Sequence, residues 1–363
     1  MMKNISWWQI EFSDLEIELT TKSLKNRNIS QGIVTEEFEE KISELLGIPY
    51  VTACTSGSTA LLMSLVAAKI GPGDEVIVPN RTWIATAHAV MMVGAKVVLA
   101  DDDGEDSSIF LNQINQKINS RTKAIIPVHL CGRSSDINGI KSIIKKRNIH
   151  LIEDAAQAFM SRNQDEFLGT QGLTGCFSLS LAKLISTGQG GFVVTKDKKV
   201  FERLKYLRNH GVNDPINVFY KEFGFNFRFN DILASIGVAQ LKRLKSNISN
   251  VKNIYTRYLQ GLGNLNAGIQ VLEKRINDGE IPLYAEIICD CREKLIKYLK
   301  NAGIQTRPYY PNLNLAPQLR DRRRFPKSEK YGMNGLFLPC GPAQPLKNVD
   351  TTIQKIHEFF KQQ

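Results

Sequence analysis

Three short segments of the chain carry side chains that could do chemistry together. The turn TSGST, residues 55–59, places small hydroxyl residues and a glycine ahead of an apolar, helix-like run. The free N–H groups and positive dipole end of such a helix start can bind phosphate, although a plain N-cap uses the same residues. Asp154 ends the apolar run IHLIED, and Lys183 lies between two apolar runs ahead of STGQGG. Taken alone, the aspartate could be a helix cap and the lysine a solvated surface charge.

Together, the three features meet the requirements of pyridoxal 5′-phosphate (PLP). This cofactor needs a lysine that forms a Schiff base with it, an acidic partner for its pyridinium nitrogen, and a phosphate site. Burial lowers the pKa of a lysine and turns its amine into a nucleophile. The carboxylate keeps the ring nitrogen protonated, so that electrons from the substrate Cα–H bond flow into the ring. We therefore expect an enzyme in which Lys183 also moves the proton.

The surrounding pattern predicts the elements that position these residues. Between about residues 48 and 195, short apolar runs alternate with helical patterns, as in α/β proteins whose mostly parallel sheet is covered by helices on both faces. Ligands bind such sheets beyond the carboxyl ends of the strands. The predicted strands cover residues 75–79, 95–100, 123–130, 149–154, 175–180 and 190–195.

The second part of the chain has a different pattern of predicted elements. After Val200 the pattern is mainly helical, including a linking helix near residues 231–244 and a strand–helix unit from IPLYAEII to REKLIKYLKNAGI. The last segment, VDTTIQKIHEFFKQ, predicts an amphipathic helix. We expect a large domain over residues 1–240 and a smaller α+β domain over residues 241–363, on which the N-terminal segment could also pack.

Composition excludes several classes of protein. With 363 residues, 42% of them hydrophobic and 23% charged, the chain is neither collagen-like, coiled-coil nor wholly disordered. The start lacks a continuous apolar run, and the longest such stretch, residues 87–100, is too short to span a membrane. We therefore expect a cytoplasmic protein with no membrane partner. Its six scattered cysteines predict reduced thiols and no metal site, because Cys289 and Cys291 lack the usual zinc spacing.

The net charge of +11 fits either nucleic acid or a phosphorylated small substrate. The densest basic run, RDRRRF at residues 320–325, reads as a solvated loop. No zinc-finger, RRM or basic-zipper pattern accompanies it, so we expect no nucleic-acid partner.

Seven segments in this order resemble the DegT/DnrJ/StrS family of PLP-dependent sugar aminotransferases, and the similarity covers nearly the whole chain. The resemblance implies a fold-type I aminotransferase, an L-glutamate donor, a nucleotide-linked keto-deoxy sugar as acceptor, and a role in surface-glycan or glycoside biosynthesis. The segments are GPGDEVIVPNRTWIATAHAVMMVGAKVVLADDD, IIPVHLCG, LIEDAAQA, KLISTGQGG, LRNHG, FGFNFRFNDILASIGVAQL and GIQTRPYYP.

The resemblance also implies a role for each matching residue. Lys183 would form the Schiff base, Asp154 would pair with the pyridinium nitrogen, and Gln157 would lie near the ring hydroxyl. Trp83 would stack on the ring, and Gly57, Ser58 and Ser178 would hold the phosphate. Asn226 would reach the phosphate of the neighbouring subunit, which makes a homodimer with shared active sites. The positions of Arg228, Arg307, Tyr309, Tyr310 and Asn314 make them candidates for binding the substrate.

Departures from the family pattern concern the substrate more than the cofactor. Ser58 replaces a threonine, whereas Phe159 and Asn314 stand where many members carry histidine, in segments expected to bind the sugar. The segment KLISTGQGG resembles members that act on C4 more than those that act on C3. A dehydratase branch has histidine in place of the lysine, so Lys183 favours transamination. A PLP-dependent dehydratase or lyase, a cyclitol ketone as acceptor, and a non-enzymatic binding protein are the alternatives.

Overall fold

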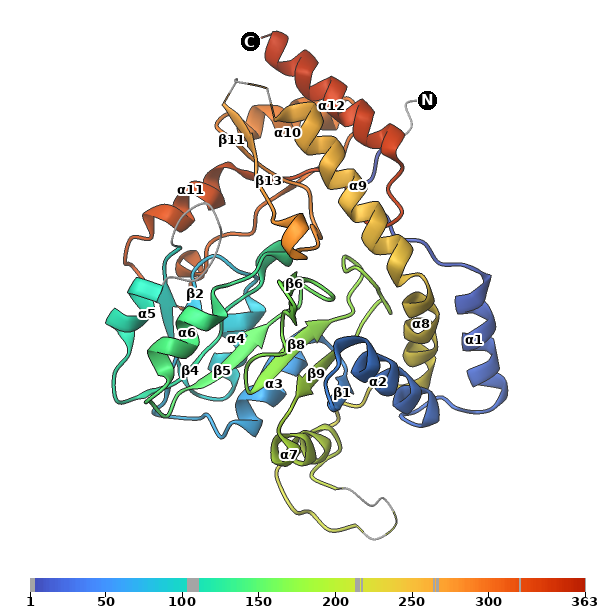
Figure 1. The fold of residues 1–363 in the computed structure, drawn as a ribbon, viewed down its shortest axis with the longest axis vertical. Helices are drawn as coiled ribbons and strands as arrows, with labels where there is room; N and C mark the ends of the chain where they lie inside the picture. The colour runs from blue at the N-terminus through green and yellow to red at the C-terminus, as the bar shows by residue number, and fades with distance from the viewer. Residues whose placement is uncertain are drawn as a thin grey trace.

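The computed structural model of the chain describes residues 4–102, 111–212, 216, 218–263, 265, 268–319 and 321–362. Two sheets organise it: a seven-stranded sheet in the lower half of Figure 1, and a four-stranded sheet nearer the two termini. The long helix α9 (Leu244–Leu262) runs from the first region to the second and follows α8 (Asp231–Lys242). The α/β fold predicted from the sequence is confirmed.

The large sheet is mostly parallel. Its strand order is β1-β9-β8-β5-β4-β2-β3, and every pair from β8 to β3 is parallel. Strand β9 alone runs against the others, because it pairs antiparallel with both β8 and β1. Six carboxyl ends and the start of β9 therefore share one edge. The strands are β1 (Tyr50–Cys54), β2 (Glu75–Pro79), β3 (Lys96–Ala100), β4 (Thr122–Ile125), β5 (His150–Asp154), β8 (Thr174–Ser178) and β9 (Gly191–Thr195).

Alternating side chains cover both faces of this sheet, since successive residues of a strand point to opposite sides. Val76 and Val78 of β2 share a core with α3 (Gly57–Ala67), α4 (Ala85–Met92) and α7 (Lys198–Arg208). Ile77, between them, packs with α5 (Leu111–Lys117) and α6 (Ile137–Ile144). Helices α1 (Asp14–Lys25) and α2 (Ile33–Leu46) lie beside α8 at the β1 side (Figure 1).

The small sheet is antiparallel, with the order β10-β11-β13-β12. The N-terminal segment reaches this region, because Ile5 bridges Ile304 and Trp8 bridges Cys340. The strands are β10 (Ile269–Val271), β11 (Glu286–Cys289), β12 (Arg307–Pro308) and β13 (Gly335–Phe337), and the helices beside them are α10 (Arg292–Asn301), α11 (Pro326–Asn334) and α12 (Leu346–Lys361). A two-stranded ribbon, β6 (Arg162–Asn163) and β7 (Glu166–Phe167), completes the elements.

The structure corrects the predicted elements at three places. The run predicted as a strand over residues 123–130 ends at Ile125, because Pro127 has no N–H to offer to a ladder. The strand β1 was not predicted at all. The helical pattern across residues 230–262 divides at Arg243 into α8 and α9. We keep the division into residues 1–240 and 241–363 as a proposal.

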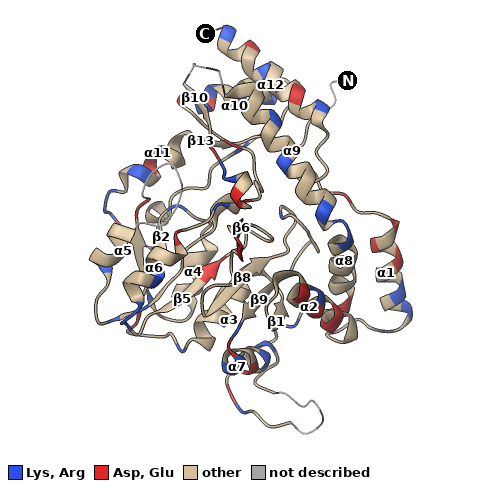
Figure 2. Ribbon diagram, viewed as in Figure 1, with Lys and Arg blue, Asp and Glu red and all other residues tan. Residues whose placement is uncertain are grey.

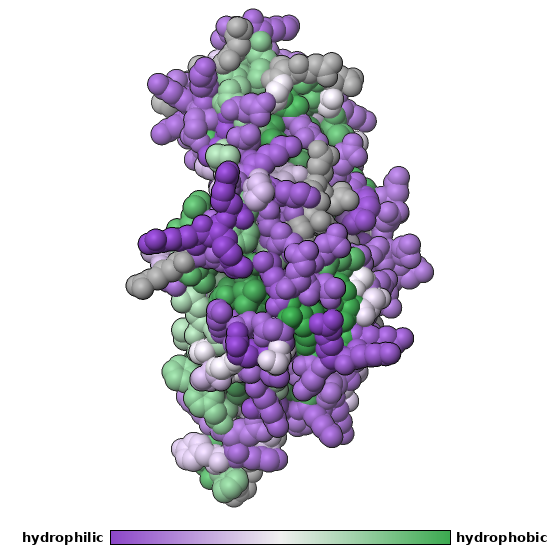
Figure 3. All heavy atoms as spheres, turned by 90° about the vertical axis from the view of Figure 1, so that its left-hand side faces the viewer, coloured by the Kyte–Doolittle hydropathy of each residue, from purple (hydrophilic) through white to green (hydrophobic). Residues whose placement is uncertain are grey.

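Charged side chains lie on many elements. Lys and Arg are spread among Asp and Glu in Figure 2, and hydrophilic residues cover most of the face shown in Figure 3. Residues 321–325 of the basic run form neither helix nor strand, and Arg320 lies outside the described residues. Within the described part of the chain, no helix is long and apolar enough to cross a membrane, and no cluster of His, Cys, Asp or Glu could hold a metal ion. All six cysteines are free thiols, and five of them are buried.

Candidate active site

A pocket of about 300 Å³ opens at the carboxyl edge of the large sheet, where β12 of the small sheet approaches it. Residues that follow β1, β2, β5 and β8 meet there, as the topology requires. The predicted site residues that line it are Gly57, Ser58, Trp83, Asp154, Gln157, Ser178, Lys183, Arg307 and Tyr310. Segments far apart in the sequence thus form one site.

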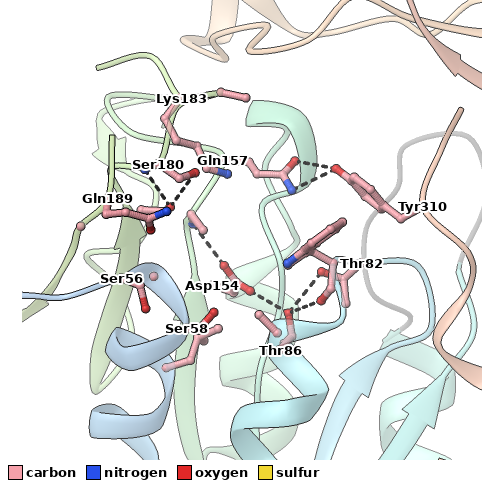
Figure 4. A pocket seen from close by; sticks show the side chains of 18 of the residues that line it. Ser56, Ser58, Thr82, Thr86, Asp154, Gln157, Ser180, Lys183, Gln189 and Tyr310 are labelled. Atoms are coloured by element: carbon pink, nitrogen blue, oxygen red, sulfur yellow. Dashed lines mark hydrogen bonds between the residues drawn. The ribbon is translucent and has the colours of Figure 1, made fainter. Parts of the chain in front are cut away.

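Lys183 points into this pocket from the loop between β8 and β9 (Figure 4). Its side chain is half-buried, and no hydrogen bond or ion pair joins its amine to any residue that the structure describes. The pKa of Lys183 is lowered to about 8, chiefly because burial removes water from the amine; Asp154 opposes this shift and the nearby Arg307 adds to it. A substantial fraction of the amine is therefore neutral, and nucleophilic, at mildly alkaline pH.

Asp154 ends β5 and its carboxylate is held from two sides. The Thr86 hydroxyl donates to Oδ2 at 2.8 Å, and the backbone N–H of Ala156 donates to Oδ1 at 3.1 Å. The side chain is buried, which raises its pKa, whereas these two hydrogen bonds and the charge of Lys183 lower it. A protonated ring nitrogen placed against this carboxylate would supply the opposite charge that burial leaves missing.

The helix α3 begins in this pocket, and its first residues form a cradle. Ser56 caps the helix by accepting a hydrogen bond from the N–H of Thr59 at 3.1 Å. Gly57 follows it and packs against β8 so closely that a Cβ there would lie 2.8 Å from the Cβ of Ser178. Only a glycine lets the helix start come this near to the strand. The free N–H groups, Ser58 and Ser178 together suit a phosphate.

These residues fit PLP by their chemistry. An uncommitted amine, a buried carboxylate and an anion cradle lie around one pocket, which are the three groups the cofactor requires. We propose that Lys183, Asp154 and the α3 start hold it in this way.

Aromatic and polar side chains close the remaining walls. Tyr310 stands edge-on to Trp83, with ring centroids 5.5 Å apart, and its hydroxyl accepts a hydrogen bond from Gln157 Nε2 at 3.1 Å (Figure 4). The guanidinium of Arg307 lies 5.7 Å from the Trp83 ring and 5.0 Å from that of Trp7. Trp83 remains 46% exposed, so one of its faces is available to a flat ligand.

Five residues that the sequence points to lie elsewhere. Tyr309 is buried and donates to Glu286, so it offers no hydroxyl to a ligand in this pocket. Asn314 is hydrogen-bonded to Asn80 at 3.0 Å. Arg228 donates to Asn209 at 2.7 Å, and Asn226 is exposed. Phe159 packs edge-on against Phe177 and Phe192, and it also lines a small second cavity with Gln157 and Lys183, so its expected place near the sugar stays a prediction.

Several lining residues were not predicted from the sequence. Thr86 is the most important, because it holds Asp154, and it follows Trp83 by three residues at the start of α4. A hydroxyl one helical turn beyond the ring-stacking position was the available signal. Thr82, Ser180 and Gln189 also line the pocket, but short polar residues in loops give no pattern of their own.

The pKa of Lys183 predicts how the apoprotein takes up its cofactor. Because the neutral amine is the nucleophile, the rate of covalent attachment of PLP is expected to rise with pH and to reach its half-maximum near pH 8. Stopped-flow absorbance at varied pH measures it. A half-maximum near the pKa of an unperturbed lysine, about 10.4, would contradict the environment described for this side chain.

Known proteins are similar to this chain along most of its length. A model of the DegT/DnrJ/EryC1/StrS aminotransferase family matches residues 11–357. The chain is 33% identical over 364 residues to the GDP-perosamine synthase of Escherichia coli O157:H7, which covers 99% of both chains. It is also 34% identical over 304 residues to the UDP-N-acetyl-3-dehydro-alpha-D-glucosamine 3-aminotransferase of Acidithiobacillus ferrooxidans, with 83% of this chain and 81% of that one covered.

Solved structures are similar to the chain as well. DesV of S. venezuelae, in complex with a ketimine intermediate, matches with a TM-score of 0.93 and 27% identity over 98% of both chains. The GDP-4-keto-6-deoxy-D-mannose-3-dehydratase of E. coli, with bound hydrated PLP, matches with a TM-score of 0.89 and 26% identity, covering 98% of this chain and all of the other.

Proposed function

The chain belongs to the DegT/DnrJ/EryC1/StrS aminotransferase family, and from this we propose that it transfers an amino group from L-glutamate to the C4 keto group of a nucleotide-linked deoxy sugar. That it is a PLP-dependent sugar aminotransferase follows from the family and from its relatives. One observation carries the choice of C4: the relative matched over 99% of both chains is a GDP-perosamine synthase, a C4 aminotransferase.

Each pocket residue has a distinct task in this proposal. PLP supplies an aldehyde that exchanges amines and a ring that takes up electrons from a breaking C–H bond. Lys183 Nζ binds the aldehyde and, once displaced by the donor, accepts the proton from the donor α-carbon and later gives a proton to the sugar carbon. Asp154 holds the proton on the ring nitrogen, and Thr86 keeps that carboxylate in place.

The polar walls can orient the substrates. Among the described residues that line this pocket, Arg307 is the one cationic side chain besides Lys183. Both proposed substrates are anionic. Tyr310 and Gln157 offer a hydroxyl and an amide within one hydrogen-bonded pair. We assign to these three residues the positioning of the donor carboxylate or the sugar nucleotide.

Product analysis tests the proposal. The enzyme with L-glutamate and a nucleotide-linked 4-keto-6-deoxy sugar is expected to give a 4-amino sugar, which NMR identifies by the chemical shift of the proton on the aminated carbon. Amination of a 3-keto acceptor alone, which the A. ferrooxidans relative makes a real alternative, would contradict C4. Release of ammonia or water without an amino sugar would instead support a lyase or dehydratase, and amination of an inosose would support the cyclitol alternative.

We also propose that two copies of the chain form the working enzyme. The segment between α7 and α8 carries Phe219, Phe223 and Phe225, which are 74%, 72% and 58% exposed. Phe223 and Phe225 also line an apolar groove that α3 and α4 border. Aromatic side chains in one exposed segment suit burial against a second copy. Asn226 lies in the same segment, outside the pocket of its own chain, which fits a role in the neighbouring site.

A charged substitution in this segment tests the dimer. Phe223→Asp is expected to convert the protein from dimer to monomer in sedimentation velocity and to weaken retention of PLP, because a buried, unpaired carboxylate disfavours association. Lys146→Glu, an exposed change in charge elsewhere, serves as control. A wild-type protein that sediments as a monomer at micromolar concentration would contradict the proposal.

A further inference from the structure

One buried carboxylate outside the pocket joins two of its walls. Glu286 lies at the start of β11, only 1% exposed, and three side chains contact its oxygens. Arg133 Nη1 donates to Oε2 at 2.6 Å, and Lys274 Nζ donates to the same oxygen. The hydroxyl of Tyr309 donates to Oε1. Burial would raise the pKa of Glu286, but the two cations lower it to about 2, so it is charged throughout the physiological range.

The first connection from Glu286 leads through Lys274 to the loop after β4. Lys274 Nζ also donates to the carbonyl oxygen of Cys131 at 2.8 Å. Cys131 has a left-handed backbone, with φ at 56°, which a residue other than glycine seldom adopts without support. Its N–H then donates to Oε1 of Gln157 at 2.9 Å. Lys274 therefore supports Cys131, the residue whose N–H holds the Gln157 amide oxygen.

The second connection leads through Tyr309. Its ring stacks on Phe337 at 4.5 Å, and the next residue, Tyr310, reaches the pocket. The Tyr310 hydroxyl meets Gln157 Nε2 at 3.1 Å, as Figure 4 shows. The two connections thus meet at Gln157 and close a ring of contacts that begins and ends at Glu286.

Stability alone is a poor reason for such a ring. Removing a carboxylate and two cations from water is costly, and well-packed apolar residues often stabilise a fold as well or better. What the charges provide is one geometry, because a carboxylate between an arginine and a lysine accepts only narrow distances and angles. Without Glu286, the cations Arg133 and Lys274 would repel each other, and Cys131 would lose its fixed support.

We propose that Glu286 is a positioning residue of this enzyme, which sets the place of Gln157 and Tyr310 in the pocket through Lys274, Arg133 and Tyr309. The inference rests on the proposed function, in which Gln157 would lie near the ring oxygen of the bound cofactor. Displacement of Gln157 would then change its hydrogen bond to that oxygen. Such a displacement should therefore change both the reaction rate and the pH at which the absorbance of the lysine-bound cofactor changes.

Two variants interrupt the ring of contacts around Glu286 at different places. Tyr309→Phe removes one hydroxyl and keeps the aromatic ring that stacks on Phe337, so the variant is expected to fold. The double variant Lys274→Met with Glu286→Gln removes one positive and one negative charge together, which leaves the net charge of the cluster unchanged. Glu75→Gln is the matched control, because Glu75 is also a buried carboxylate between an arginine and a lysine, Arg121 and Lys96, but belongs to the start of β2, at the opposite end of that strand from the pocket.

The decisive readouts are the spectral titration, the dissociation constant for PLP and the rate of the L-glutamate half-reaction. In Tyr309→Phe and in the double variant we expect a shifted midpoint of the spectral titration. We also expect the rate of the half-reaction to fall about ten- to a hundredfold, because a displacement of about 1 Å can lower a rate by that much. The Glu75→Gln variant should change the melting temperature alone. Ring variants that lose stability but keep the wild-type midpoint and rate would overturn the proposal.

A crystal structure of the Tyr309→Phe apoprotein tests the ring without the cofactor. We expect the contact between Gln157 and Tyr310 to open beyond hydrogen-bonding distance, and an unchanged contact would overturn the inference. Wild-type protein that binds no PLP would refute the proposed function instead, so the two failures are distinguishable.

Discussion

Replacement of Lys183 by alanine is expected to abolish amino transfer while leaving the fold intact. The amine has no hydrogen-bond or ion-pair partner among the described residues, so its loss breaks no such contact in that part of the structure. The reaction loses both its covalent attachment point and its proton carrier, and we expect turnover to fall by at least about a thousandfold. Steady-state kinetics and the visible spectrum of the protein with PLP measure the two losses separately.

An exposed lysine provides the control for this variant. Lys146→Ala removes the same charge from the surface and should leave both the spectrum and the rate unchanged. If the Lys183→Ala protein still formed a lysine-bound cofactor and aminated its substrate, another lysine would have to carry the chemistry.

Asp154→Asn is expected to have the second largest effect. The amide keeps the size of the side chain and can still accept from Ala156, but it carries no charge to hold the proton on the ring nitrogen. Loss of a preorganised electrostatic contact of this kind should lower turnover by about a hundred- to a thousandfold. Because Asp154 raises the pKa of Lys183, its neutralisation should also move the pH profile of PLP attachment downwards.

Thr86→Val provides a graded comparison at the same site. It removes one hydrogen bond to the carboxylate and keeps the charge, and roughly a tenfold loss of turnover is expected. A Thr86→Val effect larger than that of Asp154→Asn, or an Asp154→Asn protein with wild-type turnover, would contradict the role given to the carboxylate.

The sequence predicts the part of this site that depends on strand ends. Asp154 follows an apolar run and the TSGST turn precedes an apolar helix, so parallel topology brings them to one edge. Lys183 stands out because two apolar runs flank it. The hydrophobic pattern and the turn residues next to each of these side chains are therefore enough to predict that they lie close together.

The rest depends on contacts between distant segments, which leave no local pattern. Tyr309 and Tyr310 are neighbours, yet one faces a buried carboxylate and the other the pocket, because successive residues in an extended segment point to opposite sides. Phe159 belongs to an aromatic core that only the packing of β8 and β9 creates. Glu286 lies in the apolar run IPLYAEII, and no feature of the sequence around it indicates that Arg133 and Lys274 contact it.

The visible spectrum of the purified protein with PLP, before and after addition of L-glutamate, tests the central claim most directly. We expect a yellow band from the cofactor bound to Lys183, which glutamate bleaches and 2-oxoglutarate restores. Such a cycle would establish L-glutamate as the donor and leave the sugar acceptor to be identified. A yellow band that glutamate leaves unchanged would contradict the donor, and a protein that develops no band would contradict the assignment of Lys183.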